Sequence, residues 1–262
     1  DLPRAIQSIR EQSFRNFEWI VVDGGSVDAT PDILRHGCDV ITTWISEPDR
    51  GIYDAWNKGL ELAHGEWIGF LGADDFLWSP DSLAYLVSTL QTSYPTYRVV
   101  YGKLAVVNRE GNMLYTLGED WTKARRRFRS VMTLPHPGLM HHRSLFEEHG
   151  NFDTSYRIAG DYELLLRELR QRDALFVPGV TVVGMTLGGV STTPSASWTM
   201  LKEMRRAARR NVGGLPGFSW LLALGRYVVR RGLWGIFGEA YTRRILDVGR
   251  RLSGQAAHWT RQ

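Results

Sequence analysis

The sequence predicts an α/β fold in which a mixed, mostly parallel sheet is flanked by helices. In the first third of the 262 residues, short apolar runs alternate with segments of helical periodicity, which is the pattern of βαβ units. Acidic residues follow two of those runs, at the strand ends where such sheets bind ligands. Residues 196–262 are basic and read as helices only, so we expect a C-terminal helical extension.

The first third supplies the alternating elements. Strands are expected at the apolar runs 19–22, 40–44 and 67–71. Helices are expected at 3–12, 30–37, 52–63 and 79–90. The second and fourth of these helices have clear start signals, because a capping residue stands before a proline in Thr30-Pro31 and in Ser79-Pro80.

The middle third has a different pattern. Residues 98–107 and 113–117 read as the two strands of a hairpin, and 180–185 reads as a further strand. Helices are expected at 144–150 and from Asp161 onward, and the basic stretch 123–129 is expected to be a solvated loop. The Gly/Ser/Thr/Pro-rich segment 187–197 marks the predicted boundary between a domain of residues 1–195 and the tail.

Composition bounds the class of protein. An apolar content of 43% and a charged content of 23% fit a globular chain. The single cysteine, Cys38, excludes an internal disulfide and suits a reducing compartment. No uncharged run reaches the ~20 residues of a membrane span, and the opening residues lack the pattern of a signal peptide. The chain opens without Met on a segment that already reads as a helix start, so we expect further residues upstream.

Charge is unevenly distributed. Residues 196–262 hold 13 Lys and Arg against 3 Asp and Glu, a net of +10. The other 195 residues hold 19 against 25, a net of −6. A basic tail on a mildly acidic body indicates an anionic partner surface, either membrane lipid headgroups or nucleic acid.

Two adjacent carboxylates, Asp74 and Asp75, stand just past the predicted strand 67–71. Like charges this close raise each other's pKa, and a divalent cation removes that penalty. Mn²⁺ or Mg²⁺ prefers such oxygen ligands and usually completes its shell with substrate phosphates. With Arg50 as a phosphate contact, the segment indicates a metal–diphosphate site. The alternatives are an exposed turn at the two aspartates and a surface ion pair of Arg50 with Asp49.

Asp23 follows another predicted strand, 19–22, and precedes Gly-Gly-Ser in a turn. Its carboxylate is a candidate contact for a nucleoside, with the glycines after it letting the ligand approach the backbone. Gly25 and Ser26 are candidate nucleotide-binding residues with it. The alternative is a turn with no ligand. Asp54 and Asn57, on the following helix, are further candidates for nucleotide binding, or else form the polar part of that helix.

Asp161 begins an amphipathic helix in AGDYELLLR. It is either an N-cap or a general base for an acceptor hydroxyl. His136, between two prolines, is a candidate contact for acceptor or metal, with a structural role as the alternative. The sequence has no i,i+4 histidine pair, no P-loop, no G-x-G-x-x-G and no G-x-S-x-G, which argues against those classes of site.

Four motifs occur in one order that is typical of a known family. They are WIVVDGGSVDAT, SEPDRGIYDAWNKGLELAHGEWIGFLGADD, PHPGLMHHRSLFEEHGNFDTSYRIAGDYELLLR and GGVST. Together they resemble the inverting glycosyltransferases of family 2, which have the GT-A fold, and they look closest to bacterial members that build surface polysaccharides. The resemblance covers roughly residues 1–195.

The resemblance implies roles for residues that match the family's motifs. Asp23 corresponds to the residue that contacts a uracil or thymine base or its ribose, which favours UDP or dTDP over GDP. Asp74 and Asp75 match the family's DXD-type motif. There the second Asp holds Mn²⁺ or Mg²⁺ on the diphosphate and the first contacts ribose or metal. Arg50 corresponds to a basic residue near the donor nucleotide, and Asp161 to the catalytic base.

The chain departs from the family pattern at two places. An acidic residue commonly precedes the catalytic base, whereas Gly160 stands there in this sequence. The family's opening strand and turn, which form part of the nucleotide pocket, have no counterpart before residue 1. We therefore expect the nucleotide pocket of residues 1–262 to lack one wall.

The expected reaction is metal-dependent transfer of a sugar, with inversion, from a nucleotide-diphosphate sugar to a glycan or lipid-linked acceptor. The expected location is the cytoplasm, at the inner face of the plasma membrane. Arginines mixed with tryptophans in 196–262 fit peripheral membrane contact, or else packing on the catalytic domain or a second subunit, ahead of nucleic acid. Two alternatives are a non-catalytic nucleotide-sugar or glycan-binding partner and a sugar-1-phosphate nucleotidyltransferase. The second usually carries a Gly-rich N-terminal signature with a Lys, which is not seen.

Overall fold

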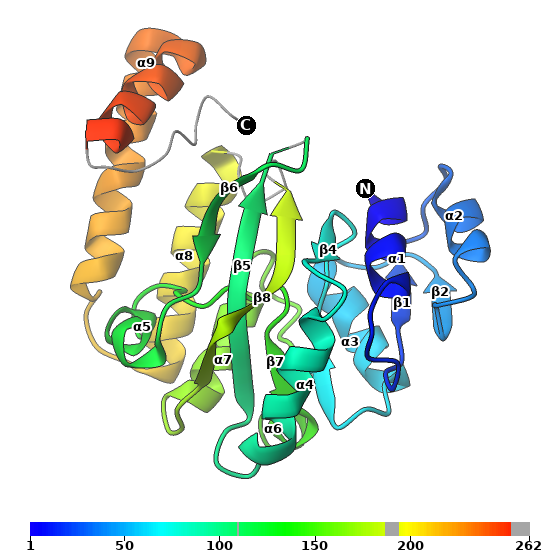
Figure 1. Ribbon diagram of the computed structural model, residues 1–262. Helices are drawn as coiled ribbons and strands as arrows, with labels where there is room; N and C mark the ends of the chain where they lie inside the picture. The colour runs from blue at the N-terminus through cyan, green and yellow to red at the C-terminus, as the bar shows by residue number, and fades with distance from the viewer. Residues whose placement is uncertain (109, 187–193, 253–262) are drawn as a thin grey trace.

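The N-terminal elements form a small parallel unit at one side of the molecule (Figure 1). The computed structural model describes residues 1–108, 110–186 and 194–252. Strands β1 (Ile20–Asp23) and β2 (Thr43–Ser46) pair in parallel as a two-stranded sheet. Around them lie helices α1 (Leu2–Arg10), α2 (Thr30–His36) and α3 (Ile52–Leu62).

A six-stranded sheet forms the centre of the molecule. Its order is β3 (Trp67–Gly69), β7 (Met140–His142), β5 (Val99–Val107), β8 (Leu175–Thr186) and β4 (Asp75–Leu77), with β6 (Met113–Leu117) paired to β5. In this sheet only β5 and β8 run parallel, and the other four pairings in the described residues are antiparallel. The predicted mixed sheet is confirmed, but antiparallel pairings predominate in it, because β6 returns beside β5 as a hairpin and β3, β4 and β7 pair antiparallel with their neighbours.

Helices cover both faces of this sheet. They are α4 (Ser82–Ser93), α5 (Trp121–Phe128), α6 (Arg143–His149), α7 (Gly160–Leu169) and α8 (Pro194–Asn211), followed by α9 (Phe218–Leu252). Alternate residues of β5 serve opposite faces: Val99 and Tyr101 pack with α3 and α5–α8, whereas Val100 packs with α1 and α4. All three are fully buried. The central strand therefore joins two apolar cores.

The basic stretch 123–129 is a correction, because most of it lies in helix α5 instead of a loop. The Asp120 side chain accepts a hydrogen bond from the Thr122 amide at 2.9 Å and caps the helix. Trp121, Ala124 and Phe128 are buried on one face, which is helical spacing. The arginines lie between these positions, so their charge concealed the apolar period.

Strand β2 also begins later than the predicted run 40–44. The amides of Val40 and Ile41 donate to the Gly37 carbonyl, both at 3.1 Å, so a turn occupies the first part of that run. The predicted hairpin is confirmed as β5 and β6, and strand 67–71 is confirmed with the shorter bounds of β3. GGVST and residues 187–193 of the predicted boundary loop lie outside the described residues. Residues 194–197 of that loop are a correction, because they begin helix α8.

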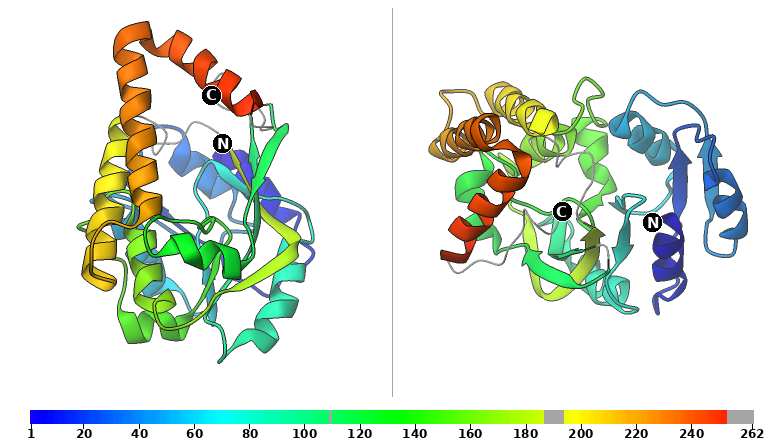
Figure 2. Two further views of the ribbon diagram at one scale, coloured as in Figure 1. Left: turned by 90° about the vertical axis from the view of Figure 1, so that its left-hand side faces the viewer. Right: turned by 90° about the horizontal axis from the view of Figure 1, so that it is seen from above.

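The described part of the tail is helical, as predicted, and its two helices differ. Met204 and Ala207 of α8 belong to the main core, so α8 packs on the body. Helix α9 rises beside α8, kinks at Gly238 (φ 74°) and turns back toward β6 (Figure 2). There the Arg250 guanidinium lies 5.8 Å from the centre of the Tyr115 ring. No helix among the described residues has the length and apolarity to cross a membrane.

Candidate active site

Loops at the ends of β1, β2 and β3 converge around the start of α3. A Cβ added to Gly24, after β1, would lie 2.5 Å from the Asp49 carboxylate, so the loop after β2 closes on the loop after β1. Trp56 of α3 packs on Phe70, just after β3, with ring centroids 4.7 Å apart. Segments 23–26 and 47–57 are thus in contact, and segment 72–75 begins two residues after Phe70.

Asp23 is buried and held by serine residues. Its carboxylate accepts hydrogen bonds from the Ser26 amide at 2.9 Å, the Ser26 hydroxyl at 2.5 Å and the Ser46 hydroxyl at 2.6 Å. Burial alone would raise its pKa, but these hydrogen bonds keep the pKa below the ordinary value. Asp23 is therefore an oriented carboxylate. Ser46, which the sequence did not single out, holds it from the neighbouring strand.

Gly25 allows the two loops to meet. Its φ is +84°, in the left-handed region that favours glycine, and a Cβ there would lie 3.3 Å from the Pro48 nitrogen. Asp49, one residue further on, accepts a hydrogen bond from the Gly51 amide at 2.8 Å. The predicted Gly25–Ser26 segment therefore shapes this wall of the site.

Arg50 lies at the rim of the site and leaves most of its guanidinium accessible. Its side chain is 78% exposed and makes an ion pair of 2.7 Å with Asp54. The surface ion pair of Arg50 therefore forms with Asp54 and not with Asp49. Asp54 also accepts from the Arg50 amide at 3.1 Å. Helix α3 begins two residues later, at Ile52, and its N-cap Gly51 provides no side-chain cap. An uncapped helix start beside an arginine favours an anion.

Asn57 connects α3 to the segment before α7. Its amide donates to the Phe152 carbonyl at 2.9 Å and accepts from the Phe152 amide at 3.0 Å. Through these two hydrogen bonds, Asn57 holds the backbone at Phe152 against α3. The prediction that it also binds nucleotide stays a prediction.

Asp74 and Asp75 fold back over Gly72. A Cβ on Gly72 would lie 2.9 Å from an Asp75 oxygen and 3.1 Å from an Asp74 oxygen. Asp75 is 6% exposed, and one of its oxygens accepts from the Gly72 amide at 3.2 Å. Burial and then the charge of Asp74 raise the pKa of Asp75 to about 7.

The other oxygen of Asp75, Oδ1, is buried and has no hydrogen-bond partner. Such an oxygen fits a metal ligand, because a divalent cation would satisfy both the lone pairs and the charge. No three His, Cys, Asp or Glu side chains in the described ranges gather closely enough to hold a metal alone. Ligand oxygens from a diphosphate would complete the coordination of a metal bound by Asp75 and Asp74.

Asp161 lies at the start of α7 but does not cap it, because the N-cap is Ala159. Its Oδ1 accepts from the Tyr162 amide at 2.8 Å and from the Tyr53 hydroxyl at 3.2 Å. Burial raises its pKa to about 6, so the carboxylate is mainly ionised at neutral pH and ready to take a proton. The geometry therefore removes the capping alternative and leaves a chemically tuned carboxylate.

His136 is buried below α3 instead of lining an open surface. Its ring stacks on Trp56 and Phe70, with centroid distances of 4.9 and 5.7 Å. Burial lowers its pKa to about 3, so the ring is neutral, and its Nε2 has no hydrogen-bond partner. The structure thus places the predicted contact residue in an aromatic cluster that supports the site.

Sequence reasoning missed Tyr53 and Glu203. Tyr53 lies in the DRGIYDAW motif, and its spacing of three residues from Trp56 was compatible with simple core packing. Glu203 is one of only three acidic residues in 196–262, and that rarity was the one available signal. In the structure its carboxylate accepts from the amides of Arg157, Ile158 and Ala159, directly before the Asp161 helix.

This combination defines a class of protein: a GT-A glycosyltransferase fold, with paired aspartates after β3 and a carboxylate at the start of α7. A sequence profile described as glycosyl transferase family 2 matches residues 1–150. The chain belongs to this family.

Relatives in the mycobacteria carry glycosyltransferase names. A PGL/p-HBAD biosynthesis glycosyltransferase of Mycobacterium bovis (strain BCG / Pasteur 1173P2) is 33% identical over 169 residues, which is 63% of each chain. An uncharacterized glycosyltransferase of Mycobacterium tuberculosis (strain ATCC 25618 / H37Rv) is 31% identical over 216 residues, 80% of this chain and 79% of the relative. The match thus spans less than two thirds of the first relative.

Solved structures share the fold at low sequence identity. Staphylococcus aureus TarS 1–349 in complex with UDP-GlcNAc has a TM-score of 0.62 at 16% identity, covering 90% of this chain and 69% of TarS. The mannosyltransferase PcManGT of Pyrobaculum calidifontis, in complex with GDP-Man and Mn²⁺, has a TM-score of 0.62 at 21% identity. That match covers 96% of this chain and 76% of PcManGT. At these identities the likeness shows the fold alone.

Proposed function

We propose that this protein transfers a sugar from a nucleotide-diphosphate sugar to an acceptor hydroxyl, with inversion at the anomeric carbon. The observation that carries the proposal is two carboxylates whose pKa is raised by burial, Asp75 after β3 and Asp161 at the start of α7. Asp75 is buried with a free oxygen, and Asp161 has a pKa of about 6. The first suits a metal–diphosphate complex and the second suits a base, which together form the minimum set for this reaction.

The proposed donor site uses the loops after β1, β2 and β3. Asp23, oriented by two serines, would accept hydrogen bonds from a base or ribose, so UDP and dTDP are proposed ahead of GDP. Solved structures with this fold bind UDP-GlcNAc or GDP-Man, which supports a nucleotide-sugar ligand. Arg50 and the uncapped start of α3 would contact the diphosphate.

Mn²⁺ or Mg²⁺ held by Asp75 and Asp74 would stabilise negative charge on the leaving diphosphate. Asp161 would take the proton of the acceptor hydroxyl while that oxygen bonds to the anomeric carbon. In the same displacement, the bond from this carbon to the diphosphate oxygen breaks. A direct displacement of this kind inverts the anomeric centre, and the proton ends on Asp161.

The Asp161→Asn variant tests this proposal. Because Asn keeps the shape but cannot act as a base, transfer should fall by about 100-fold or more, while binding of UDP, dTDP or GDP with Mn²⁺ stays unchanged. Isothermal titration measures the binding, and release of the diphosphate measures transfer. Asp32→Asn is a matched control, since its side chain is 72% exposed. Full turnover, or loss of nucleotide binding by a folded Asp161→Asn protein, would contradict the role.

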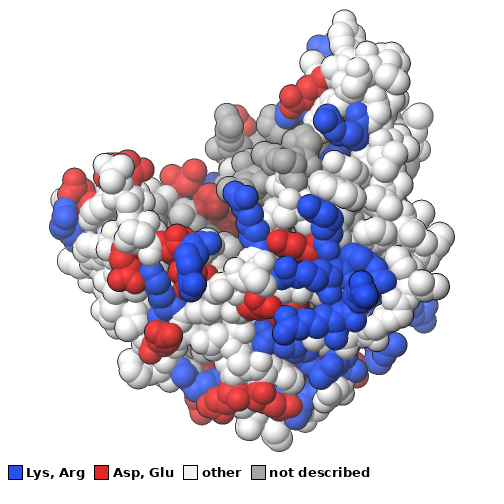
Figure 3. Space-filling model, turned by 180° about the vertical axis from the view of Figure 1, so that it is seen from behind, with Lys and Arg blue, Asp and Glu red and all other residues white. Residues whose placement is uncertain are grey.

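The proposed acceptor is a glycan on a membrane lipid, and the proposed location is the inner face of the plasma membrane. Helix α9 supports peripheral contact. Of the 20 large apolar side chains exposed in the described part of the chain, 13 lie within positions 212–252. Figure 3 shows this projection with few charged atoms, above a face of the body where Lys and Arg gather.

A further inference from the structure

We propose that Glu203 and Tyr53 are positioning residues that hold the Asp161 carboxylate from two sides. This inference rests on the proposed role of Asp161 as the base, since Glu203 and Tyr53 would act on acceptor chemistry through it. Glu203 comes from α8 and Tyr53 from α3, so the two helices approach the start of α7 from different parts of the chain. The contacts described next carry the proposal.

Glu203 binds three consecutive backbone amides. Its Oε1 accepts from the Arg157 amide at 2.8 Å. Its Oε2 accepts from the Ile158 amide at 2.8 Å and from the Ala159 amide at 2.9 Å. A carboxylate that accepts several amide hydrogen bonds is a strong, oriented anchor. The segment that ends at Gly160 is therefore fixed by a side chain from the tail.

The rest of α8 supports this anchor. The Arg206 guanidinium donates to the Ser155 hydroxyl at 2.7 Å and lies 3.6 Å from the centre of the Tyr156 ring. One turn further, Arg210 pairs with Asp153 at 2.9 Å. Helix α8 thus contacts the segment before Asp161 along its length, and Glu203 is the contact nearest to Asp161.

Tyr53 holds the same segment from the opposite side. Its hydroxyl shares its one hydrogen in a three-centre bond, donating to the Ile158 carbonyl at 2.6 Å and to Oδ1 of Asp161 at 3.2 Å. The Ile158 peptide is therefore bound at its amide by Glu203 and at its carbonyl by Tyr53. Glycine at 160 makes this possible, because a Cβ there would lie 2.8 Å from the Tyr53 ring. Tyr53 occupies the space that a side chain at 160 would need.

The two residues act on the charge of Asp161 in opposite directions. The negative charge of Glu203 raises the pKa of Asp161, and the Tyr53 hydrogen bond lowers it. These are the charged and titratable side chains from α8 and α3 that act on this carboxylate. Replacing Glu203 with an uncharged isostere and Tyr53 with a non-donating one should therefore shift the pKa of Asp161 in opposite directions. A general loss of packing around Asp161 would not produce two opposite shifts.

The test is a ¹³C NMR titration of the full chain labelled at aspartate Cγ, with Asp161→Asn used to assign the signal. Tyr53→Phe should raise the pKa of Asp161 by about 0.5 to 1. Glu203→Gln should lower it by a smaller amount, because the charge of Glu203 is the weakest of these influences on the carboxylate. Tyr85→Phe, on an exposed residue of α4, and Glu239→Gln, on an exposed ion pair of α9, are matched controls that should leave it unchanged.

Hydrogen exchange of the amides of residues 157–159 separates geometry from charge. Glu203→Gln should speed their exchange by about tenfold. Glu203→Asp keeps the charge with a shorter reach, so it should speed exchange while the pKa of Asp161 stays near its original value. This second variant also covers the case in which Glu203→Gln does not fold.

Unchanged pKa values in folded Tyr53→Phe and Glu203→Gln proteins, or shifts in the same direction, would overturn the proposal. Neither readout requires a donor, a metal or an acceptor, so they are independent of the reaction. Full transfer by Asp161→Asn would instead refute the proposed function and leave these titrations as they are. The two failures are thus distinguishable.

Discussion

At the scale of a residue, Asp75 makes the protein sensitive to pH. An aspartate whose pKa is raised to about 7 in the folded chain prefers to stay protonated there. In the unfolded chain its pKa returns to about 3.9. Its protonated form therefore contributes stability that is fully present below about pH 4 and is lost as the pH rises through 7. A bound divalent cation would reverse the preference, because it requires the ionised form.

This sign gives a prediction for Asp75→Asn. In the absence of metal, the variant should melt several degrees higher than the original chain at pH 7.5, and the difference should disappear near pH 4. Thermal melts with chelator across this range measure it. Added Mn²⁺ should stabilise the original chain at pH 7.5 and have no effect on the variant. Equal melting profiles of the two proteins would show that Asp75 ionises without cost.

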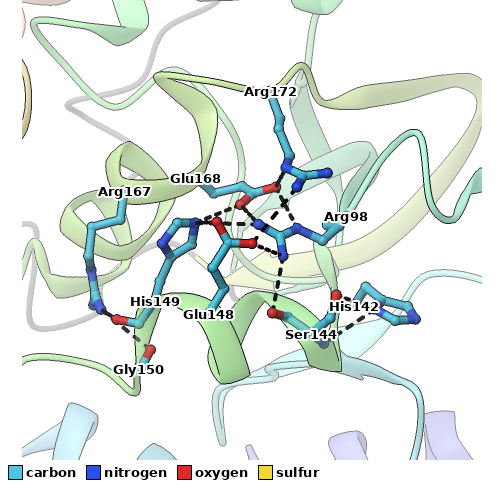
Figure 4. A network of polar contacts seen from close by, with 9 residues as sticks. All are labelled: Arg98, His142, Ser144, Glu148, His149, Gly150, Arg167, Glu168 and Arg172. Atoms are coloured by element: carbon cyan, nitrogen blue, oxygen red, sulfur yellow. Dashed lines mark hydrogen bonds and ion pairs between the residues drawn. The ribbon is translucent and has the colours of Figure 1, made fainter.

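At the scale of the elements, a buried charge network joins β5 to α6 and α7 (Figure 4). The Arg98 side chain, just before β5, is 4% exposed and pairs with Glu168, which is 1% exposed. Its other contacts include Glu148 at 2.7 Å and the Ser144 carbonyl at 3.1 Å. His149 also approaches Glu168, at 2.8 Å. The network thus attaches the C-terminal end of α7, the helix that begins near Asp161, to the residue that precedes the central strand β5.

Removing one partner should therefore destabilise the fold. Arg98→Met would leave Glu168 buried without its main counter-charge, at an expected cost of about 3–5 kcal/mol in the free energy of unfolding. Adding Glu168→Met should recover much of that loss. Urea unfolding measures both changes. Arg10→Met, which breaks an exposed pair with Asp39, should cost less than about 1 kcal/mol. An equal cost for Arg98→Met and Arg10→Met would contradict the network's importance.

Elements with a clean local period could be predicted, and contacts between distant segments could not. Helix α3 was accessible because its apolar residues follow one helical period, and the strand before Asp74 was accessible because β3 belongs to the continuous apolar run 67–71. The apolar period of α5 was hidden among its arginines. Antiparallel β7 and β4 are three residues each, too short for a pattern.

The same distinction applies to the site. Asp23, Asp74 and Asp161 stand next to regular elements and were found from local sequence. Glu203 lies far along the chain from the amides that it binds, and nothing in its own segment identifies those partners. The role of Tyr53 depends on the missing side chain of Gly160, which becomes visible only when α3 and α7 are packed together.

At the scale of the whole molecule, α9 presents an apolar stripe to the outside. Phe218, Leu222, Val229 and Ile236 recur at helical spacing and are 44–75% exposed. Residues 212–238 contain three arginines and no acidic residue. An apolar stripe with arginines at its sides fits an anionic bilayer, whereas two copies of it would place like charges together.

Vesicle binding tests this surface. The chain should float with phosphatidylglycerol vesicles, bind phosphatidylcholine vesicles much more weakly, and be released by salt. Val229→Glu should weaken binding by about tenfold or more, while Tyr85→Glu, at an exposed site on α4, should not. If Val229→Glu instead dissolved a dimer seen by sedimentation and left vesicle binding unchanged, a second copy would be the partner of α9.

Gly160 lies so close to the Tyr53 ring that substitutions at these two positions, 107 residues apart in the chain, are coupled in evolution. A mutation that adds even one methyl group at 160 is harmful while a tyrosine stands at 53, because the ring must move and release both of its hydrogen bonds. A smaller residue at 53 makes room for a side chain at 160 but leaves the Ile158 carbonyl without its donor. Either substitution alone is therefore deleterious, and we expect residues 53 and 160 to change together among related proteins.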